Sequence, residues 1–465
     1  MALSHVVIFP FMAQGHALPL LDLSKALSSQ QITVTIITTP GNAKSISDCI
    51  HSYPNISFLE IPFPAIDGVP EGCENTSQLP SMEFHLPFLQ ATKQLQNPFQ
   101  NILQSMMKSQ NPPICVISDF FLGWTLAVCK ALGVPRLVFH GMGVLSMAIS
   151  KSVWVHQPQL KAKSVFDDLD LPGMKLPFTL TSSDLPDTIN TQNHDDPLSK
   201  FIEEVGEADV NSSGIVCNTF EELERSHIPC FESFYSGSAK AWCVGPLLLY
   251  DKMEDLDIHK NNSSVSIMQW LTEQITPNSV IYVSFGTQAD LSDAQLDEVA
   301  FGLEESGFPF VWAVRSKTWC LPKDIEEKIK GRGLVIKEWV DQRRILLHRA
   351  IGGFLSHCGW NSVLESVSAG VPILAWPMIA EQSLNAKLIA DGLGAGINVK
   401  KEAAGAVVSR EAICDGVREL MGGEKGRNAR ERAEALGREA RRAVQEGGSS
   451  HRTLQKMIGQ LKNPS

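Results

Sequence analysis

The sequence has little of what nucleic-acid binders, disulfide-bonded secreted domains and membrane-spanning proteins need. Its 40 lysines and arginines are outnumbered by 51 aspartates and glutamates, and the net charge of -11 argues against a nucleic-acid partner. The 10 cysteines form no CxxC pair, which favours reduced thiols over a disulfide framework or a zinc site. No apolar run approaches the roughly 20 residues that span a bilayer. We therefore expect a cytoplasmic protein without stable membrane insertion.

Motifs of several enzyme classes are also missing. No Gly-x-Gly-x-x-Gly follows the first strand of either half of the chain, which counts against a nicotinamide-dependent oxidoreductase. A serine hydrolase would need a Gly-x-Ser-x-Gly elbow, and the sequence has none. The acidic triplets at residues 168–170 and 255–257 do not follow a buried strand, so they predict acidic loops and no metal site.

What the sequence does contain is a repeated α/β pattern. At 465 residues the chain exceeds the size at which one hydrophobic core stops growing, so two domains are expected. Short apolar, β-branched runs alternate with longer segments of helical period, twice over, and this alternation is typical of parallel sheets with crossover helices. We predict an N-terminal domain over residues 1–245, a linker over 246–264, a C-terminal domain over 265–447 and a last helix over 448–465.

The individual strands can be placed from these runs. The predicted strands are residues 6–9, 33–38, 114–118, 136–139, 214–217, 280–285, 311–314, 334–337, 353–356 and 373–375. In doubly wound parallel sheets, ligands collect at the carboxyl ends of the strands. We therefore expect two such α/β domains that face each other across a ligand-binding cleft.

The segment with the most functional information lies between Trp339 and Gln382. A predicted strand ends at Ser356, the polar turn His357-Cys358-Gly359-Trp360-Asn361-Ser362 follows, and a helix begins near Val363. Backbone N–H groups and the positive end of a helix dipole make such a turn suitable for a diphosphate. Taken alone, the same pattern also fits a helix that is merely capped by Asn or Ser.

The complete segment resembles the signature box of plant secondary-product glycosyltransferases, the inverting family 1 enzymes that use UDP-sugars. The match includes both ends of the box, the His-Cys-Gly-Trp-Asn-Ser core, Glu365, the 370–372 turn and Trp376-Pro377-Met378. The strand and glycine turn at residues 279–287 resemble the same family. The resemblance implies the GT-B architecture, with two Rossmann-like domains and a last helix that returns to the first domain.

The resemblance also implies roles for individual residues. Trp339 would stack on the uracil, and Gln342 would reach the ribose or the base edge. Glu365 would accept hydrogen bonds from the ribose hydroxyls. The remaining donor-site residues are Thr287, His357, Asn361 and Ser362 at the diphosphate, Trp360, Glu381 and Gln382 at the sugar, and Val340 beside Trp339. In this family a glutamine in the place of Gln382 indicates glucose.

Three residues depart from the commonest form of the box. Asp341 stands where proline is usual, so we expect a less rigid loop after Trp339. Glu381 replaces a frequent aspartate, and its extra methylene would loosen the choice of sugar. Ile379 replaces an aromatic residue, which would widen the acceptor side of the cleft. None of the three removes a group that the chemistry requires.

A catalytic base is predicted at the end of the first strand. Gly15-His16 is followed by Pro19, which matches the Gly-His-x-x-Pro arrangement of the same family. A histidine with an ordinary pKa of about 6.5 can accept a proton near neutral pH. Asp119 ends another predicted strand and matches the family's aspartate, which would hold the imidazole and stabilise its protonated form. His16 and Asp119 are therefore the predicted catalytic residues.

The sequence thus predicts an inverting transfer of a sugar, glucose by the identity of Gln382, to a hydroxyl of a small apolar metabolite such as a flavonoid, phenol or terpenoid. We expect a monomer that needs no metal and no cofactor besides the UDP-sugar donor. The acceptor pocket is expected mainly around Phe11, Met12 and residues 84–88, 120–124, 142–147 and 178–188. The alternatives are a C-glycosyltransferase for phenols, a non-catalytic UDP-sugar-binding protein and, less in keeping with the motifs, an oxidoreductase.

Overall fold

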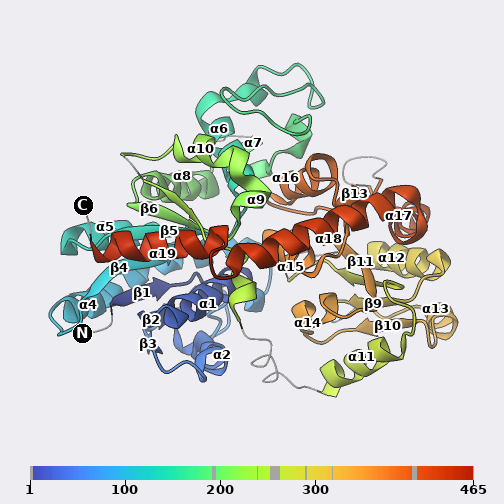
Figure 1. The fold of residues 1–465 in the computed structure, drawn as a ribbon, viewed down its shortest axis with the longest axis horizontal. Coiled ribbons are helices and arrows are strands. Elements are labelled where there is room, and N and C mark those ends of the chain that lie inside the picture. The colour runs from blue at the N-terminus through green and yellow to red at the C-terminus, as the bar shows by residue number, and fades with distance from the viewer. Residues whose placement is uncertain are drawn as a thin grey trace. The chain divides into compact units, whose positions relative to one another are not determined.

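The chain forms two compact units in the computed structural model (Figure 1). The structure describes residues 4–190, 195–237, 239–251, 262–287, 291–316, 318–400 and 406–463. The first unit consists of Met1–His156, Thr188–Asp255 and Arg442–Ser465. The second consists of Gln157–Asp187 and Leu256–Arg441.

These boundaries differ from the expected ones in two places. Residues 157–187, which we expected in the N-terminal domain, belong to the second unit, and the return to the first unit occurs at Arg442 rather than at residue 448. Most of the expected linker, residues 252–261, lies outside the described residues. Lys387 shows why residues 157–187 join the second unit, because its ammonium pairs with Asp184 at 3.3 Å and donates to the Thr179 carbonyl at 2.9 Å.

Among the described residues, the first unit contains a seven-stranded sheet in the order β3-β2-β1-β4-β5-β6-β7, and every neighbouring pair is parallel. Its strands are β1 (His5–Phe9), β2 (Thr33–Thr38), β3 (Ile56–Glu60), β4 (Pro113–Asp119), β5 (Arg136–His140), β6 (Gly214–Cys217) and β7 (Ala241–Cys243). The helices are α1 (Gln14–Ser29), α2 (Pro40–Ile50), α3 (His85–Ala91), α4 (Gln96–Met107), α5 (Thr125–Leu132), α6 (Val144–His156), α8 (Pro197–Val210), α9 (Glu221–Glu224), α10 (Ile228–Glu232) and α19 (Ser449–Lys462), with α7 (Asp187–Asn190) at the boundary between the units.

The second unit, as far as it is described, contains a six-stranded parallel sheet in the order β10-β9-β8-β11-β12-β13. Its strands are β8 (Val280–Ser284), β9 (Phe310–Ala313), β10 (Gly333–Ile336), β11 (Ile351–Ser356), β12 (Ile373–Ala375) and β13 (Gly396–Asn398). The helices are α11 (Asn262–Glu273), α12 (Asp293–Ser306), α13 (Lys323–Lys328), α14 (Gln342–Leu346), α15 (Trp360–Ala369), α16 (Gln382–Lys387) and α17 (Arg410–Gly422). Helix α18 (Glu424–Val444) runs across the boundary to the first unit.

The prediction of two doubly wound parallel sheets is confirmed. The strand order of each sheet reverses next to its first strand, so β1 and β4 are neighbours in one sheet and β8 and β11 in the other. Their carboxyl ends therefore meet at one edge of each sheet, where the catalytic and donor motifs are located in the sequence. In the first unit, α19 contributes Leu454, Met457 and Ile458 to the core.

Candidate functional site

The predicted catalytic pair comes together in the first unit. His16 lies in the first turn of α1, directly after β1, and Asp119 is the last residue of the neighbouring strand β4. His16 Nδ1 and Asp119 Oδ2 are 2.9 Å apart. The aspartate side chain is fully buried, whereas the histidine keeps 25% of its surface exposed. The geometry is that of an imidazole held by a carboxylate, with one part of the ring open to a substrate.

Asp119 is itself held from two directions. Its Oδ1 accepts a hydrogen bond from the Phe121 backbone N–H at 3.0 Å, and its carbonyl accepts one from Arg136 Nη2 at 3.2 Å. Arg136 is fully buried and also donates to Ser118, Thr125 and Ser212, at 2.8, 2.9 and 2.7 Å. Sequence reasoning missed Arg136, although a charged residue at the start of an apolar strand is a signal for such a role.

Arg136→Met is expected to lower the free energy of unfolding by about 3 kcal/mol, because several buried oxygens lose a charged donor. Urea denaturation monitored by circular dichroism would measure the loss. Arg225→Met is the matched control, since Arg225 makes an exposed pair with Glu221 and should change stability by less than about 0.5 kcal/mol. Equal unfolding midpoints for the two variants would contradict this role of Arg136.

Two aromatic rings contact that of His16. The ring centroids of Phe11 and Phe121 lie 5.4 and 5.3 Å from that of His16. Phe88 packs against Phe11 at 6.0 Å, and Phe63 packs against Phe88 at 4.9 Å. These contacts give His16 an apolar, aromatic environment.

Not every expected acceptor residue lies in this environment. Trp124 packs against Phe9 and Phe99 in the core, at 5.7 and 5.8 Å between ring centroids. Residues 178–187 belong to the second unit. His85, at the start of α3, is half-buried. Its pKa is lowered, mainly by burial and secondly by the nearby charge of His16.

In the second unit, the loop before α14 carries the predicted uracil-binding residues. Trp339 is 36% exposed, as a stacking platform requires, whereas Val340 is buried in the core beside Ile345. Asp341 caps α14 through a 3.2 Å hydrogen bond that its Oδ1 accepts from the Arg344 backbone N–H. The residue that replaces proline is therefore the cap of α14, and the expected loss of rigidity in this loop stays a prediction.

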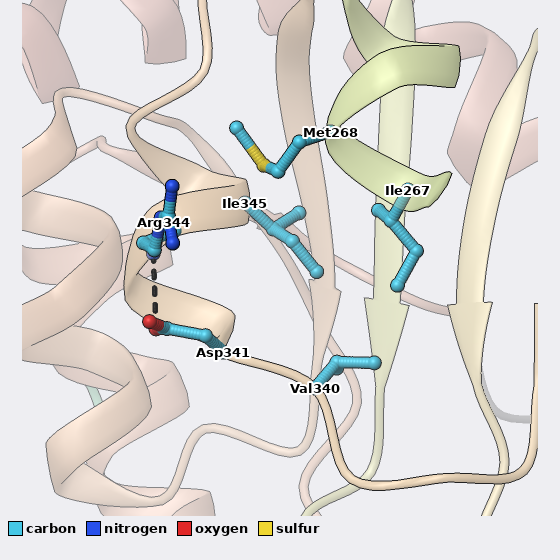
Figure 2. Close-up of a pocket in the computed structure, with 6 residues that line it drawn as sticks. All are labelled: Ile267, Met268, Val340, Asp341, Arg344 and Ile345. Carbon is cyan, nitrogen blue, oxygen red and sulfur yellow. Dashed lines mark hydrogen bonds between the residues drawn. The ribbon is translucent and has the colours of Figure 1, made fainter. Parts of the chain in front are cut away.

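Val340 also lines a small hollow with Ile267, Met268, Asp341, Arg344 and Ile345 (Figure 2). Its cavity volume is about 10 Å³, which is about the room that one water molecule needs and is too small for a ligand. Most of the residues that line it are apolar. We assign this hollow to packing behind the Trp339 loop and not to a ligand.

Gln342 and Glu365 lie in direct contact. Gln342 Nε2 donates to Glu365 Oε2 at 2.6 Å and to Ser362 Oγ at 2.9 Å. Arg343 Nε donates to the other carboxylate oxygen, Oε1, at 3.2 Å. The predicted ribose-binding residues therefore form one cluster between α14 and α15, and Arg343 is a member that sequence reasoning missed.

His357 is packed between two glycines at the ends of β8 and β11. A Cβ added at Gly286 or at Gly359 would lie 2.6 Å from His357 Nε2, so neither position accepts a side chain without displacing the ring. Gly286 also has a φ of 77°, in the left-handed region. Burial lowers the pKa of His357 to about 4, against an opposing contribution from the Ser284 backbone. The imidazole is thus neutral at pH 7, with one N–H to donate.

The other residues predicted at the diphosphate flank this turn. Gly359 precedes α15, so Asn361 and Ser362 belong to the first turn of that helix, at its positive end. Thr287 is exposed directly after Gly286, at the end of β8. Trp360 is only 2% exposed, so most of its surface packs within the protein.

The residues predicted to contact the sugar are ordered by a turn before α16. Gln382 Oε1 accepts hydrogen bonds from the backbone N–H groups of Met378 and Ile379, both at 3.0 Å. Asn385 Nδ2 donates to Glu381 Oε1 at 3.1 Å and to the Cys358 carbonyl at 3.0 Å. Asn385, which sequence reasoning missed, therefore connects this turn to the turn that holds His357.

The described residues show neither a metal site nor a membrane-spanning helix. No group of three or more histidine, cysteine, aspartate or glutamate side chains gathers there in a way that could hold a metal ion. Within the same residues, no helix combines the length and apolar character needed to cross a bilayer.

Family models match nearly the whole chain. The model described as "Glycosyltransferase, N-terminal domain" matches residues 4–249, and the model described as "UDP-glucoronosyl and UDP-glucosyl transferase" matches residues 245–426. The chain belongs to the UDP-glycosyltransferase family. It is therefore a glycosyltransferase enzyme, and its two doubly wound units are those of the GT-B fold.

Full-length relatives come from plants. UDP-glycosyltransferase 73B4 of Arabidopsis thaliana is 37% identical, over 98% of this chain and 98% of its own length. Scopoletin glucosyltransferase of Nicotiana tabacum is 35% identical, over 99% of this chain and 98% of its own. This UDP-glycosyltransferase is accordingly of the plant type, which transfers a sugar from a UDP-sugar to a small acceptor.

Solved structures give the same result. UGT73P12 of Glycyrrhiza uralensis, complexed with glycyrrhetinic acid 3-O-monoglucuronide, has a TM-score of 0.89 and 29% identity, over 99% of this chain and 96% of its own. UGT2 of Phytolacca americana, complexed with UDP-2fluoro-glucose and pterostilbene, has a TM-score of 0.81 and 29% identity, over 99% of this chain and 100% of its own.

Proposed function

We propose that this enzyme transfers glucose from UDP-glucose to a hydroxyl of a small apolar metabolite, such as a flavonoid, a phenol or a terpenoid, with inversion at the anomeric carbon. The observation that carries the proposal is the 2.9 Å contact between His16 Nδ1 and the buried carboxylate of Asp119. The glucosyl donor is supported by Gln382 and by a relative that is a scopoletin glucosyltransferase. The apolar acceptor is supported by the aromatic rings around His16.

In this mechanism His16 is the general base. Asp119 holds the Nδ1 proton, so Nε2 is the atom that takes the proton from the acceptor hydroxyl. The acceptor oxygen forms a bond to the anomeric carbon while the bond from that carbon to the β-phosphate oxygen breaks. UDP leaves with the electron pair, and a single displacement converts an α-linked donor into a β-glycoside. Asp119 stabilises the imidazolium that forms on His16.

The charge of the departing UDP would be balanced in the second unit. Asn361, Ser362 and the N-terminus of α15 would present donors, and the neutral His357 precedes them in the same turn. Trp339 would stack on the uracil and Glu365 would accept from the ribose hydroxyls. Because the protein holds these donors in place beforehand, they need not reorient when negative charge develops on the leaving group.

The direct test is a screen of phenolic and terpenoid acceptors with UDP-glucose. Product mass identifies the transferred sugar, and the anomeric coupling constant in the NMR spectrum reports its configuration. A β-linked product attached through oxygen is expected. A product that retains the α configuration would contradict the mechanism, and one joined through carbon would identify a C-glycosyltransferase instead.

Removal of divalent metal ions is expected to leave turnover unchanged within about twofold, because the proposed donors to the leaving diphosphate are protein groups. Initial rates would be compared before and after dialysis against EDTA, with and without added Mg²⁺. A loss of about tenfold or more that Mg²⁺ restores would show that a metal ion stabilises the leaving group.

A further inference from the structure

Among the described residues, Arg343 is the one cation that forms an ion pair with the Glu365 carboxylate. Its Nε lies 3.2 Å from Glu365 Oε1, and the two side chains are 18% and 11% exposed. Arg343 follows Gln342 at the start of α14, whereas Glu365 lies on α15. A charged hydrogen bond that is largely shielded from water is stronger than a surface pair and more costly to break.

The cluster fixes the direction of the carboxylate. Gln342 Nε2 binds Oε2 at 2.6 Å while Arg343 Nε binds Oε1, so one protein donor holds each oxygen. Gln342 is itself tied to Ser362 at 2.9 Å. A carboxylate offers about four lone-pair directions. Two donors therefore leave room for a vicinal pair of hydroxyls on the same carboxylate.

The charge of Glu365 also depends on this neighbour. Burial raises the pKa of Glu365, Arg343 opposes that rise most strongly and Gln342 opposes it less, whereas Asp341 adds to it. Tyr282 on β8 is a further titratable group that interacts with Glu365, and burial raises its pKa, so it stays neutral. Without the guanidinium, the pKa of Glu365 would rise further, so its carboxylate would lose its charge at a higher pH than in the wild type.

We propose that Arg343 is a positioning residue of the nucleotide site, which balances the charge of Glu365 and directs its carboxylate so that it can bind the two ribose hydroxyls. This inference rests on the proposed function, because it assigns the ribose to Glu365. It adds a residue of α14 that would set nucleotide affinity without contacting the nucleotide.

The test is titration calorimetry with UDP at pH 8 and pH 6. Arg343→Ala is expected to weaken UDP binding about tenfold at pH 8 and by a larger factor at pH 6. Arg343→Lys should recover part of the loss, because lysine keeps the charge without the planar fork. Arg344→Ala is the matched control and should stay within about twofold of the wild type, since the Arg344 side chain lies at the apolar hollow (Figure 2).

A double-mutant cycle separates this role from a merely structural one. In a Glu365→Gln background, Arg343→Ala should change UDP affinity by less than about twofold, because the charge that it balances is gone. The inference would be overturned if Arg343→Ala lowered UDP affinity equally in both backgrounds. It would also be overturned if the affinity of Arg343→Ala relative to the wild type were the same at pH 8 and pH 6. If the wild type itself binds no UDP, the proposed function fails as well. If the wild type binds UDP and Arg343→Ala binds equally well, this inference alone fails.

Discussion

His16→Ala is expected to lower kcat for glycosyl transfer by about 10³-fold, while the affinity for UDP stays within about twofold. The loss follows because the acceptor hydroxyl must release its proton as it attacks, and among the described residues His16 is the base that Asp119 holds. UDP affinity should survive because the predicted nucleotide contacts lie in the second unit. Initial rates with UDP-glucose and a phenolic acceptor, together with calorimetry of UDP binding, would measure both quantities.

Two further measurements decide whether His16 acts as the base. An acceptor with a more acidic phenol should lose less activity in the His16→Ala variant, because less help is needed to ionise it. Asp119→Asn should keep the protein folded but lower kcat, since an amide does not stabilise the imidazolium. If acidic and weakly acidic phenols lose activity equally, His16 serves to position the acceptor and does not remove its proton.

Glu365→Ala is expected to weaken UDP binding about 100-fold, because a carboxylate that would accept two ribose hydroxyls is removed. The variant also leaves Arg343 and Gln342 without their partner, so a thermal melt must show that the second unit remains folded. Titration calorimetry with UDP measures the effect. Turnover at saturating UDP-glucose should fall much less than affinity, since the ribose contact is made before and during transfer alike.

Glu381→Ala is the matched control for this experiment, since Glu381 is predicted to contact the sugar. It should leave UDP affinity within about twofold and affect turnover with UDP-glucose instead. The same loss of UDP affinity in Glu365→Ala and His16→Ala would contradict the assignment of nucleotide binding to one group of residues and proton transfer to the other.

Much of the fold could be predicted because burial on both faces leaves a local signature. Runs such as residues 33–38 and 280–285 are continuous and β-branched, and they coincide with β2 and β8 within one residue. Strands β3, β7 and β13 were missed because each buries only one residue completely, so none carries the signature of burial on both faces. The end of α16 has no such signature, since the helix ends at Lys387 and a π-helical turn, Leu388–Gly392, follows directly.

The candidate site was predictable where its residues stand at fixed spacings in the chain. His16 and the residues between Trp339 and Gln382 belong to such patterns, and the sequence alone supplied them. The partners that hold these residues were not predicted. Arg343 lies inside the box without being one of the residues that carry the resemblance, and Asn385 and Arg136 lie outside it; each acts through contacts with another element of the fold.

The sequence by itself determined the class of the fold, its two parallel sheets and the motifs of a UDP-glycosyltransferase. The tertiary structure alone decided that His16 Nδ1 lies 2.9 Å from Asp119, although 103 positions separate them in the chain. It also decided that residues 157–187 pack with the second unit and that Arg343 shares Glu365 with Gln342. The reason is physical: periodicity reports only which face of an element is buried, whereas the partner on that face is chosen when distant elements pack together.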